Sequence, residues 1–280
     1  MINSSDYQGI CPKQLEALSE AFTQDRANLV AANASVRNGF LETATDYKAL
    51  QKLPFTFSVD LKQGSITNQK SSGRCWLFSA LNTFRYELIK NYQVEDFELS
   101  QNYLFFYDKL ERSNFYLENI LHLPDEPVDG RLFCFLNADP VMDGGQWDMM
   151  ANLVRKYGVV PKYVYPDGAN SIASRPMNQY LTSLLREYAI ELRQMQHDGA
   201  DCEKLQERKM AMMKDVYRVI AIALGEPPKT FDLTMTSKDG KVYREYGIDG
   251  KTFFLSADFF YPHILKKRCF HGTLQSERCR

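Results

Sequence analysis

The sequence lacks an excess of one charge, a long apolar run and any paired cysteine motif. Its 280 residues include 34 basic and 35 acidic side chains, for a net charge of −1. Proteins that bind nucleic acid through its phosphates need a concentrated basic surface, so this balance argues against a nucleic-acid partner. Charges interrupt the first thirty residues, and no stretch reaches the ~20 apolar residues that span a bilayer. We therefore expect neither a signal peptide nor a membrane partner.

The six cysteines are scattered and form neither CxxC pairs nor a dense disulfide framework. This usage is typical of a reducing compartment, so we expect a cytoplasmic protein. The same scatter provides no paired Cys or His spacing for a structural zinc ion. The sequence thus predicts no metal and no cofactor.

Apolar periodicity predicts a mainly helical chain of the α+β class. An amphipathic helix is expected over Lys13–Arg37 and a short strand over Phe55–Val59. Between the later helices, the stretch around Pro124 and Gly130 indicates a loop. The other predicted elements are helices over Cys75–Tyr92, from Ser100, over Trp147–Tyr157, over Asn178–Gln196 and over Cys202–Leu224, and a β-hairpin of Phe231–Thr236 and Val242–Tyr246.

Cys75 lies at the N-terminus of one of these predicted helices, after a turn rich in serine and glycine. The partial positive charge of a helix N-terminus stabilises a thiolate, which is the nucleophilic form of cysteine. Gln69 could fold back across the turn and donate to an oxyanion, together with the N–H of Cys75. Trp76 could pack beneath the thiol, and Gly73 lets a substrate approach the backbone. For any single cysteine, the alternative is an inert, buried side chain.

The spacing Gln69-(five residues)-Cys75-Trp76-x-Phe78-Ser79 resembles the nucleophile signature of the papain-like cysteine peptidases. The finer resemblance is to the bleomycin hydrolase and aminopeptidase C branch, with bacterial aminopeptidase C nearer, and it extends from about residue 10 to residue 260. Four runs carry it: Ile66–Trp76, Glu98–Phe106, Asp143–Met149 and Lys156–Lys162.

This resemblance implies a role for each matching residue. Cys75 would be the nucleophile, Gln69 an oxyanion donor, and Gly144–Gly145 a backbone stretch that binds extended peptide substrates; a plain tight turn is the alternative for the two glycines. Gly73 and Trp76 would line the same substrate site. Ser72 stands where secreted papain relatives usually have a disulfide cysteine.

The resemblance also divides the chain. It implies an N-terminal helical arm over 1–50, a papain-like helical domain over 51–170, and a helical insertion with the β-hairpin over 171–260. The insertion implies a homo-hexameric ring, whereas an ordinary helical layer needs no oligomer. Residues 261–280 form an anomalous tail in which basic residues and cysteines replace the apolar pattern.

The base of the reaction is harder to find. In the family, a His and an Asn come from a β-rich domain, the Asn within an Asn-Ser-Trp-Gly run, and this sequence contains no such run. Surface or packing roles are expected for its four histidines, His122, His197, His263 and His271. We therefore expect a truncated chain with the His/Asn domain largely missing, and an inactive or impaired enzyme.

Three hypotheses remain at this point. The first is a cysteine aminopeptidase that removes N-terminal residues from peptides through an acyl-enzyme. The second is a non-catalytic fragment or an assembly module of the same family. A thiol redox protein is disfavoured, because no resolving cysteine lies within a few residues of Cys75.

Overall fold

The computed structural model describes residues 9–53, 56–59, 61 and 64–257. The chain divides into two units, Met1–Leu61 and Lys62–Arg280. Among the described residues, no helix combines the length and the apolar character needed to cross a bilayer.

In the described part of the first unit, four helices form and none of them buries a residue. The helix predicted over Lys13–Arg37 is in fact two helices, because Asp25 ends the first and caps the second. Its carboxylate accepts a hydrogen bond from the N–H of Ala27 at 2.8 Å, and aspartate is a favoured N-cap residue. The helices are α1 (Pro12–Gln24), α2 (Arg26–Asn38), α3 (Phe40–Ala44) and α4 (Tyr47–Gln51), and none contains a buried residue.

The strand predicted over Phe55–Val59 is wrong in its described part. Phe55 lies outside the described residues, and Thr56–Val59 forms no strand. An alternating apolar pattern of five residues is too short to specify a strand when no neighbouring strand pairs with it.

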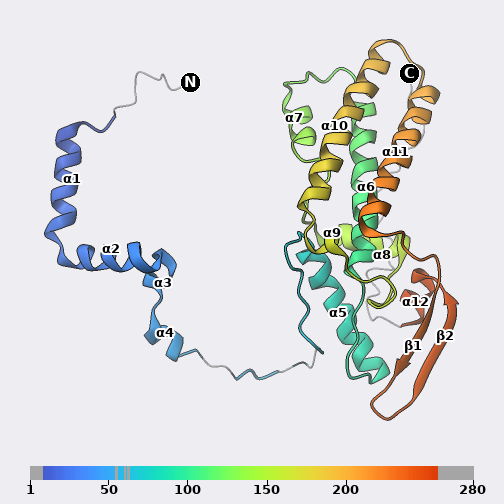
Figure 1. Ribbon diagram of the computed structural model, residues 1–280, viewed down its shortest axis with the longest axis horizontal. Coiled ribbons are helices and arrows are strands. Elements are labelled where there is room, and N and C mark those ends of the chain that lie inside the picture. Colours follow the sequence, from blue (N-terminus) through green and yellow to red (C-terminus); the bar gives the residue numbers. More distant parts are fainter. Residues whose placement is uncertain (1–8, 54–55, 60, 62–63, 258–280) are drawn as a thin grey trace. The chain divides into compact units, whose positions relative to one another are not determined.

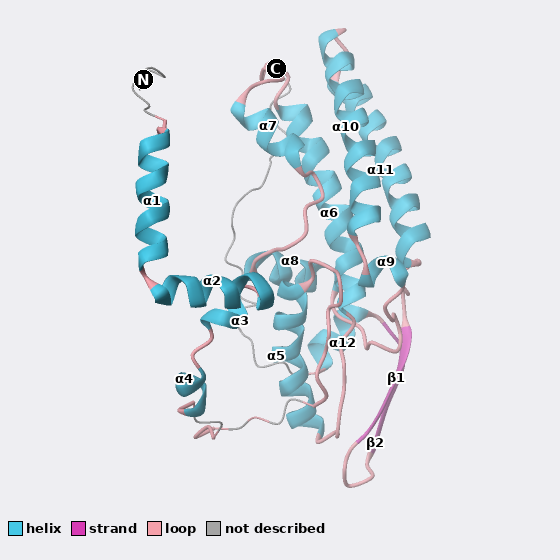
Figure 2. Ribbon diagram, turned by 60° about the vertical axis from the view of Figure 1, so that its left-hand side comes forward, coloured by secondary structure: helices cyan, strands magenta, loops and turns pink. Residues whose placement is uncertain are grey.

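The second unit contains the remaining elements (Figure 1). The long helices α6, α10 and α11 pack side by side, and both views show this (Figures 1 and 2). Helices α5 and α8 pack against α6 and against each other. The elements are α5 (Cys75–Tyr92), α6 (Gln101–His122), α7 (Arg131–Ala138), α8 (Trp147–Tyr157), α9 (Ala169–Ile172), α10 (Arg175–His197), α11 (Cys202–Leu224), β1 (Phe231–Thr236), β2 (Val242–Ile248) and α12 (Gly250–Ser256).

The predicted helices of this unit are confirmed. Helices α5, α8 and α11 have the predicted bounds, and α6 begins at Gln101, one residue after the expected start. Ser100 is its N-cap, and the Ser100 hydroxyl accepts from the N–H of Tyr103 at 3.1 Å. Helix α10 begins slightly earlier than expected and includes Pro176 in its first turn. Proline is tolerated there because that N–H has no partner within the helix.

Short helices escaped the sequence patterns. Helix α7 lies in the stretch predicted to be a loop, and α9 and α12 were not predicted. Segments of four to eight residues contain too few apolar repeats to distinguish a short helix from a loop. His122, expected in a surface or packing role, is the last residue of α6.

The hairpin prediction is confirmed, with β2 extending two residues further than expected. Strands β1 and β2 pair antiparallel, and residues of β1 alternate between buried and exposed. Gly240 adopts a φ of +86° in the connecting turn, a conformation that glycine reaches without a steric penalty. Together with the helices, this two-stranded sheet confirms the mainly helical α+β class.

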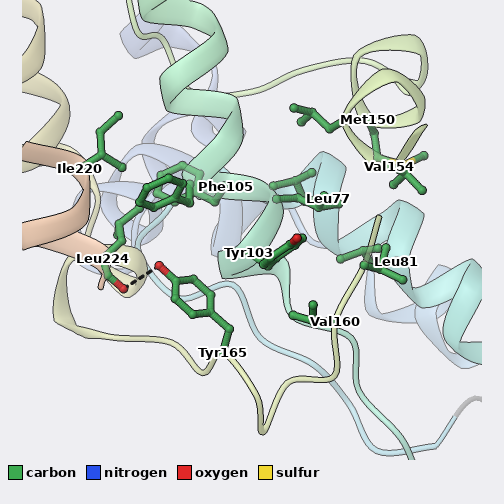
Figure 3. Packing of buried hydrophobic residues seen from close by; sticks show 14 of the residues in the cluster. Leu77, Leu81, Tyr103, Phe105, Met150, Val154, Val160, Tyr165, Ile220 and Leu224 are labelled. Atoms are coloured by element: carbon green, nitrogen blue, oxygen red, sulfur yellow. Dashed lines mark hydrogen bonds between the residues drawn. The ribbon is translucent and has the colours of Figure 1, made fainter. Parts of the chain in front are cut away.

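The core of the second unit joins helices that are distant in sequence (Figure 3). Tyr165 connects the loop between α8 and α9 to the end of α11, because its buried hydroxyl donates to the carbonyl of Leu224 at 2.9 Å. Burying one large apolar side chain contributes about 1.5–3 kcal/mol, so this cluster fixes α5 firmly against α6 and α8. The labelled members come from α5 (Leu77, Leu81), α6 (Tyr103, Phe105), α8 (Met150, Val154) and α11 (Ile220, Leu224), with Val160 and Tyr165 between α8 and α9.

Candidate active site

Cys75 is the first residue of α5, and its free thiol is exposed. The next residues turn inward, with Leu77 and Phe78 buried in the core. The first N–H groups of a helix have no partners within it, so the thiol lies where unpaired donors gather. Packing of α5 therefore fixes the position of an exposed thiol.

The turn before Cys75, which we call the nucleophile turn (69–74), is closed by its own side chains. The Ser72 hydroxyl donates to the carbonyl of Gln69 at 2.6 Å, and Nε of Arg74 donates to that hydroxyl oxygen at 2.9 Å. Gln69 is thus held through its backbone, six residues before the thiol. Its role as an oxyanion donor stays a prediction.

Arg74 anchors the nucleophile turn, although the sequence analysis did not single it out. Its fully buried guanidinium pairs with Asp167 at 2.5 Å and lies over the rings of Phe78 and Phe105, at 5.2 and 5.7 Å from their centres. Asp167 also accepts from Lys162 at 2.6 Å. Burial by itself raises the pKa of Asp167, but hydrogen bonds from Arg74 and Lys162 outweigh it and hold that pKa below its usual range.

Two glycines bring the nucleophile turn into contact with the segment 143–145, here called the glycine segment. The N–H of Gly144 donates to the carbonyl of Gly73 at 3.0 Å. A Cβ on Gly73 would lie only 2.1 Å from Cβ of Asp143, so no larger residue fits without movement. At Gly144 the constraint is a φ of +88°, which favours glycine for its backbone conformation.

Gly145 packs against Trp76, the residue after the thiol. A Cβ on Gly145 would lie 2.7 Å from the indole ring, so the glycine backbone rests directly on Trp76. The structure therefore brings Gly73, Trp76, Gly144 and Gly145 together around the start of α5. Their substrate-binding role stays a prediction.

The glycine segment is also held by Lys109, a buried residue of α6 that was not predicted from the sequence. Nζ of Lys109 donates to the carbonyl of Val141 at 2.7 Å and to the carboxylate of Asp143 at 2.8 Å. Asp143 accepts further hydrogen bonds from Ser174 at 3.0 Å and Asn178 at 2.9 Å. A usable sequence signal existed, because the charged pair Asp108-Lys109 directly follows the apolar and aromatic run Tyr103–Tyr107 of α6.

The two described histidines contact their own helices and not Cys75. Nδ1 of His122 lies 2.7 Å from the carbonyl of Glu118, and His197 faces Asp198 with its side chain 87% exposed. Each helical residue rises about 1.5 Å, so His122 lies about 15 Å along α6 from Arg112, a residue that contacts Gly144. His263 and His271 lie outside the described residues.

Two named relatives resemble most of this chain. It is 42% identical over 240 residues to aminopeptidase C of Lactobacillus delbrueckii subsp. lactis, which covers 86% of this chain and 54% of the relative. Human bleomycin hydrolase is 40% identical over 243 residues, covering 85% of this chain and 53% of the relative. The chain thus spans about half the length of the curated relatives it matches.

A solved structure and a family model agree with these relatives. The crystal structure of PepW from Lactobacillus rhamnosis aligns with a TM-score of 0.88 and 37% identity, over 91% of this chain and 57% of that one. The model of the Peptidase C1-like family matches residues 9–260. The papain-like resemblance drawn from the sequence is thereby confirmed, and the chain belongs to the Peptidase C1-like family.

Proposed function

We propose that this chain carries the nucleophile half of the active site of a cytoplasmic cysteine aminopeptidase. The observation that carries the proposal is an exposed Cys75 at the start of α5, flanked by glycine backbone that a peptide can approach. Membership of the family, and relatives named aminopeptidase C and bleomycin hydrolase, support it.

In the proposed reaction, Cys75 forms an acyl-enzyme with the first residue of the peptide, and water then hydrolyses it. The Cys75 thiolate attacks the carbonyl carbon of the first residue of a peptide, and the oxyanion accepts hydrogen bonds from the N–H of Cys75 and the amide of Gln69. The C–N bond then breaks, the amine leaves with a proton, and water hydrolyses the thioester. The first residue of the peptide is released.

Substrate binding falls to Gly145 more than to Gly144. The N–H of Gly144 is bonded to Gly73, and its carbonyl accepts from Arg112. Gly145 is exposed, so its backbone is the part of the glycine segment that an extended peptide can reach. In this proposal, the peptide runs along Gly145 and past Trp76 to the thiol.

Proton transfer needs an imidazole that pairs with the thiol and returns a proton to the leaving amine. Neither described histidine contacts Cys75. We therefore propose that this chain alone has little or no aminopeptidase activity. Its Cys75 thiol can still react with a peptide-like electrophile that binds along the glycine segment.

The test is covalent labelling with a dipeptidyl chloromethyl ketone that has a free amino terminus. Attack by the thiolate forms an S–C bond and expels chloride. We expect saturable labelling of Cys75, about tenfold faster than that of Cys134, which is also an exposed free thiol. Cys75→Ala should abolish the saturable component. Equal labelling of the two thiols without saturation would contradict the proposal, and rapid release of an N-terminal residue by the chain alone would contradict its inactivity.

A second candidate is an assembly module, and the surface of the α10–α11 hairpin favours it. Large apolar side chains on these two helices are exposed, including Ile190 at 71% and Ile222 at 79%. Exposed apolar side chains of this size are common at protein contacts. Sedimentation of the chain alone should then give a homo-hexamer, whereas a monomer at all concentrations would leave the hairpin an ordinary helical layer.

A further inference from the structure

Within the described part of the chain, the hydrogen bond that holds the peptide unit between Gly144 and Gly145 is at its carbonyl end. This unit contains the carbonyl of Gly144 and the N–H of Gly145, which point in opposite directions because the bond is planar and trans. Nη2 of Arg112 donates to that carbonyl from α6. The N–H of Gly145 therefore points away from Arg112.

Arg112 is itself fixed by a buried carboxylate. Its Nε lies 2.9 Å from both carboxylate oxygens of Asp108, one turn earlier on α6. The side chains are 12% and 5% exposed, so the pair is largely shielded from water. A planar guanidinium held at one edge has a defined direction for its remaining donors, which here face Gly144.

Two adjacent glycines need an external contact to hold their peptide unit in one orientation. Gly144 and Gly145 carry no side chains that could pack into the core, and glycine backbone has more conformational freedom than any other residue. Lys109 holds the start of the segment through Val141 and Asp143. Arg112 hydrogen-bonds the peptide unit that joins Gly144 to Gly145.

We infer that Arg112, held by Asp108, is a positioning residue for the glycine segment. It orients the Gly144–Gly145 peptide unit so that the N–H of Gly145 faces a bound peptide. This inference rests on the proposed function. Arg112 acts through the orientation of this peptide unit and does not itself touch substrate. Its removal therefore weakens the binding of peptides at Gly145 and leaves the reactivity of the Cys75 thiol unchanged.

The direct test is hydrogen exchange of the peptide covering residues 141–147, measured by mass spectrometry. Arg112→Gln should speed exchange there about tenfold, since a hydrogen bond to a charged donor is lost. Arg112→Lys should restore part of the protection. The double variant Asp108→Asn/Arg112→Gln leaves no unpaired buried carboxylate, so it separates the loss of the grip from a failure to fold.

The matched control is Arg193→Gln. Arg193 also donates to backbone carbonyls, those of Leu123 at 3.0 Å and Glu126 at 2.6 Å, in a segment outside the glycine segment. Its removal should leave exchange of residues 141–147 unchanged. Unchanged exchange in both Arg112→Gln and the double variant, or the same increase in Arg193→Gln, would overturn the inference.

Labelling kinetics give the second readout. In Arg112→Gln, the half-saturating concentration of the dipeptidyl chloromethyl ketone should rise about tenfold, while alkylation of Cys75 by iodoacetamide should stay within about twofold. Equal losses with both reagents would overturn the inference. If the unmodified chain shows no saturation at all, the proposed function fails, and the exchange experiment alone decides the role of Arg112.

Discussion

The two sides of Cys75 are held in place by different means. The nucleophile turn leads into α5, whose apolar side chains are buried, and one buried arginine closes it. The glycine segment has no packing side chains beyond Asp143, and charged residues of α6 grip its backbone. A segment of bare glycine backbone has few side chains of its own to pack, so neighbouring side chains have to supply its rigidity.

Loss of Asp167 tests the nucleophile side and should have the largest effect. In Asp167→Ala, the fully buried guanidinium of Arg74 loses its carboxylate, and Lys162 loses its closest one. Breaking a buried ion pair from one side costs about 3–5 kcal/mol. Chemical denaturation should show this fall in the free energy of unfolding. Glu191→Ala, which removes the partner of Arg208 in an exposed pair, is the control and should cost at most about 1 kcal/mol.

Gly73→Ala tests the contact between the two sides, with an intermediate effect expected. The added Cβ would displace Asp143 and push the glycine segment away from the turn. We expect a loss of about 2–3 kcal/mol in the free energy of unfolding, and weaker labelling by the dipeptidyl reagent. Gly168→Ala is the control, because no atom lies within 4 Å of a Cβ at that position. If both variants behave alike, the two sides are not in the tight contact described above.

Acid should weaken both sides, with the smallest effect of the three. Burial raises the pKa values of both Asp143 and Asp167. The charge and hydrogen bond of Lys109 outweigh it at Asp143, and hydrogen bonds from Arg74 and Lys162 outweigh it at Asp167, so both pKa values lie below the ordinary one. A carboxylate with a lowered pKa stabilises the fold at pH values above its unfolded value of about 4, and this stability is lost as the pH falls through the folded value.

Denaturation at a series of pH values measures this dependence. The free energy of unfolding should fall below about pH 4, and the slope should be shallower in Asp167→Asn than in the unmodified chain. An identical slope in the two proteins would show that Asp167 does not contribute, leaving Asp143 as the acid-sensitive group of the pair.

Some parts of the site could be found from the sequence because their signals are local. The helix that begins at Cys75 has an apolar period of several turns, and Ser100 caps the next helix with a side chain three residues from its partner. The nucleophile spacing from Gln69 to Trp76 was equally local. Short helices such as α7 gave no comparable period.

Other parts of the site depend on contacts between distant residues. Arg74 and Asp167 are separated by 93 positions, and Arg112 and Gly144 by 32. No periodicity or spacing relates such residues, because their proximity follows from how α6 and the loops before α8 and α9 pack. The charges that follow the apolar run of α6 could have suggested buried partners, but not which ones.

The sequence by itself determined the family, the helix that presents Cys75, and the glycines beside it, because motif spacing and helical period are properties of neighbouring residues. Only the tertiary structure decided which backbone groups of the glycine segment remain available to a peptide. A glycine's N–H and carbonyl look the same in every sequence, and their availability depends on whether Gly73 and Arg112 reach them in the fold.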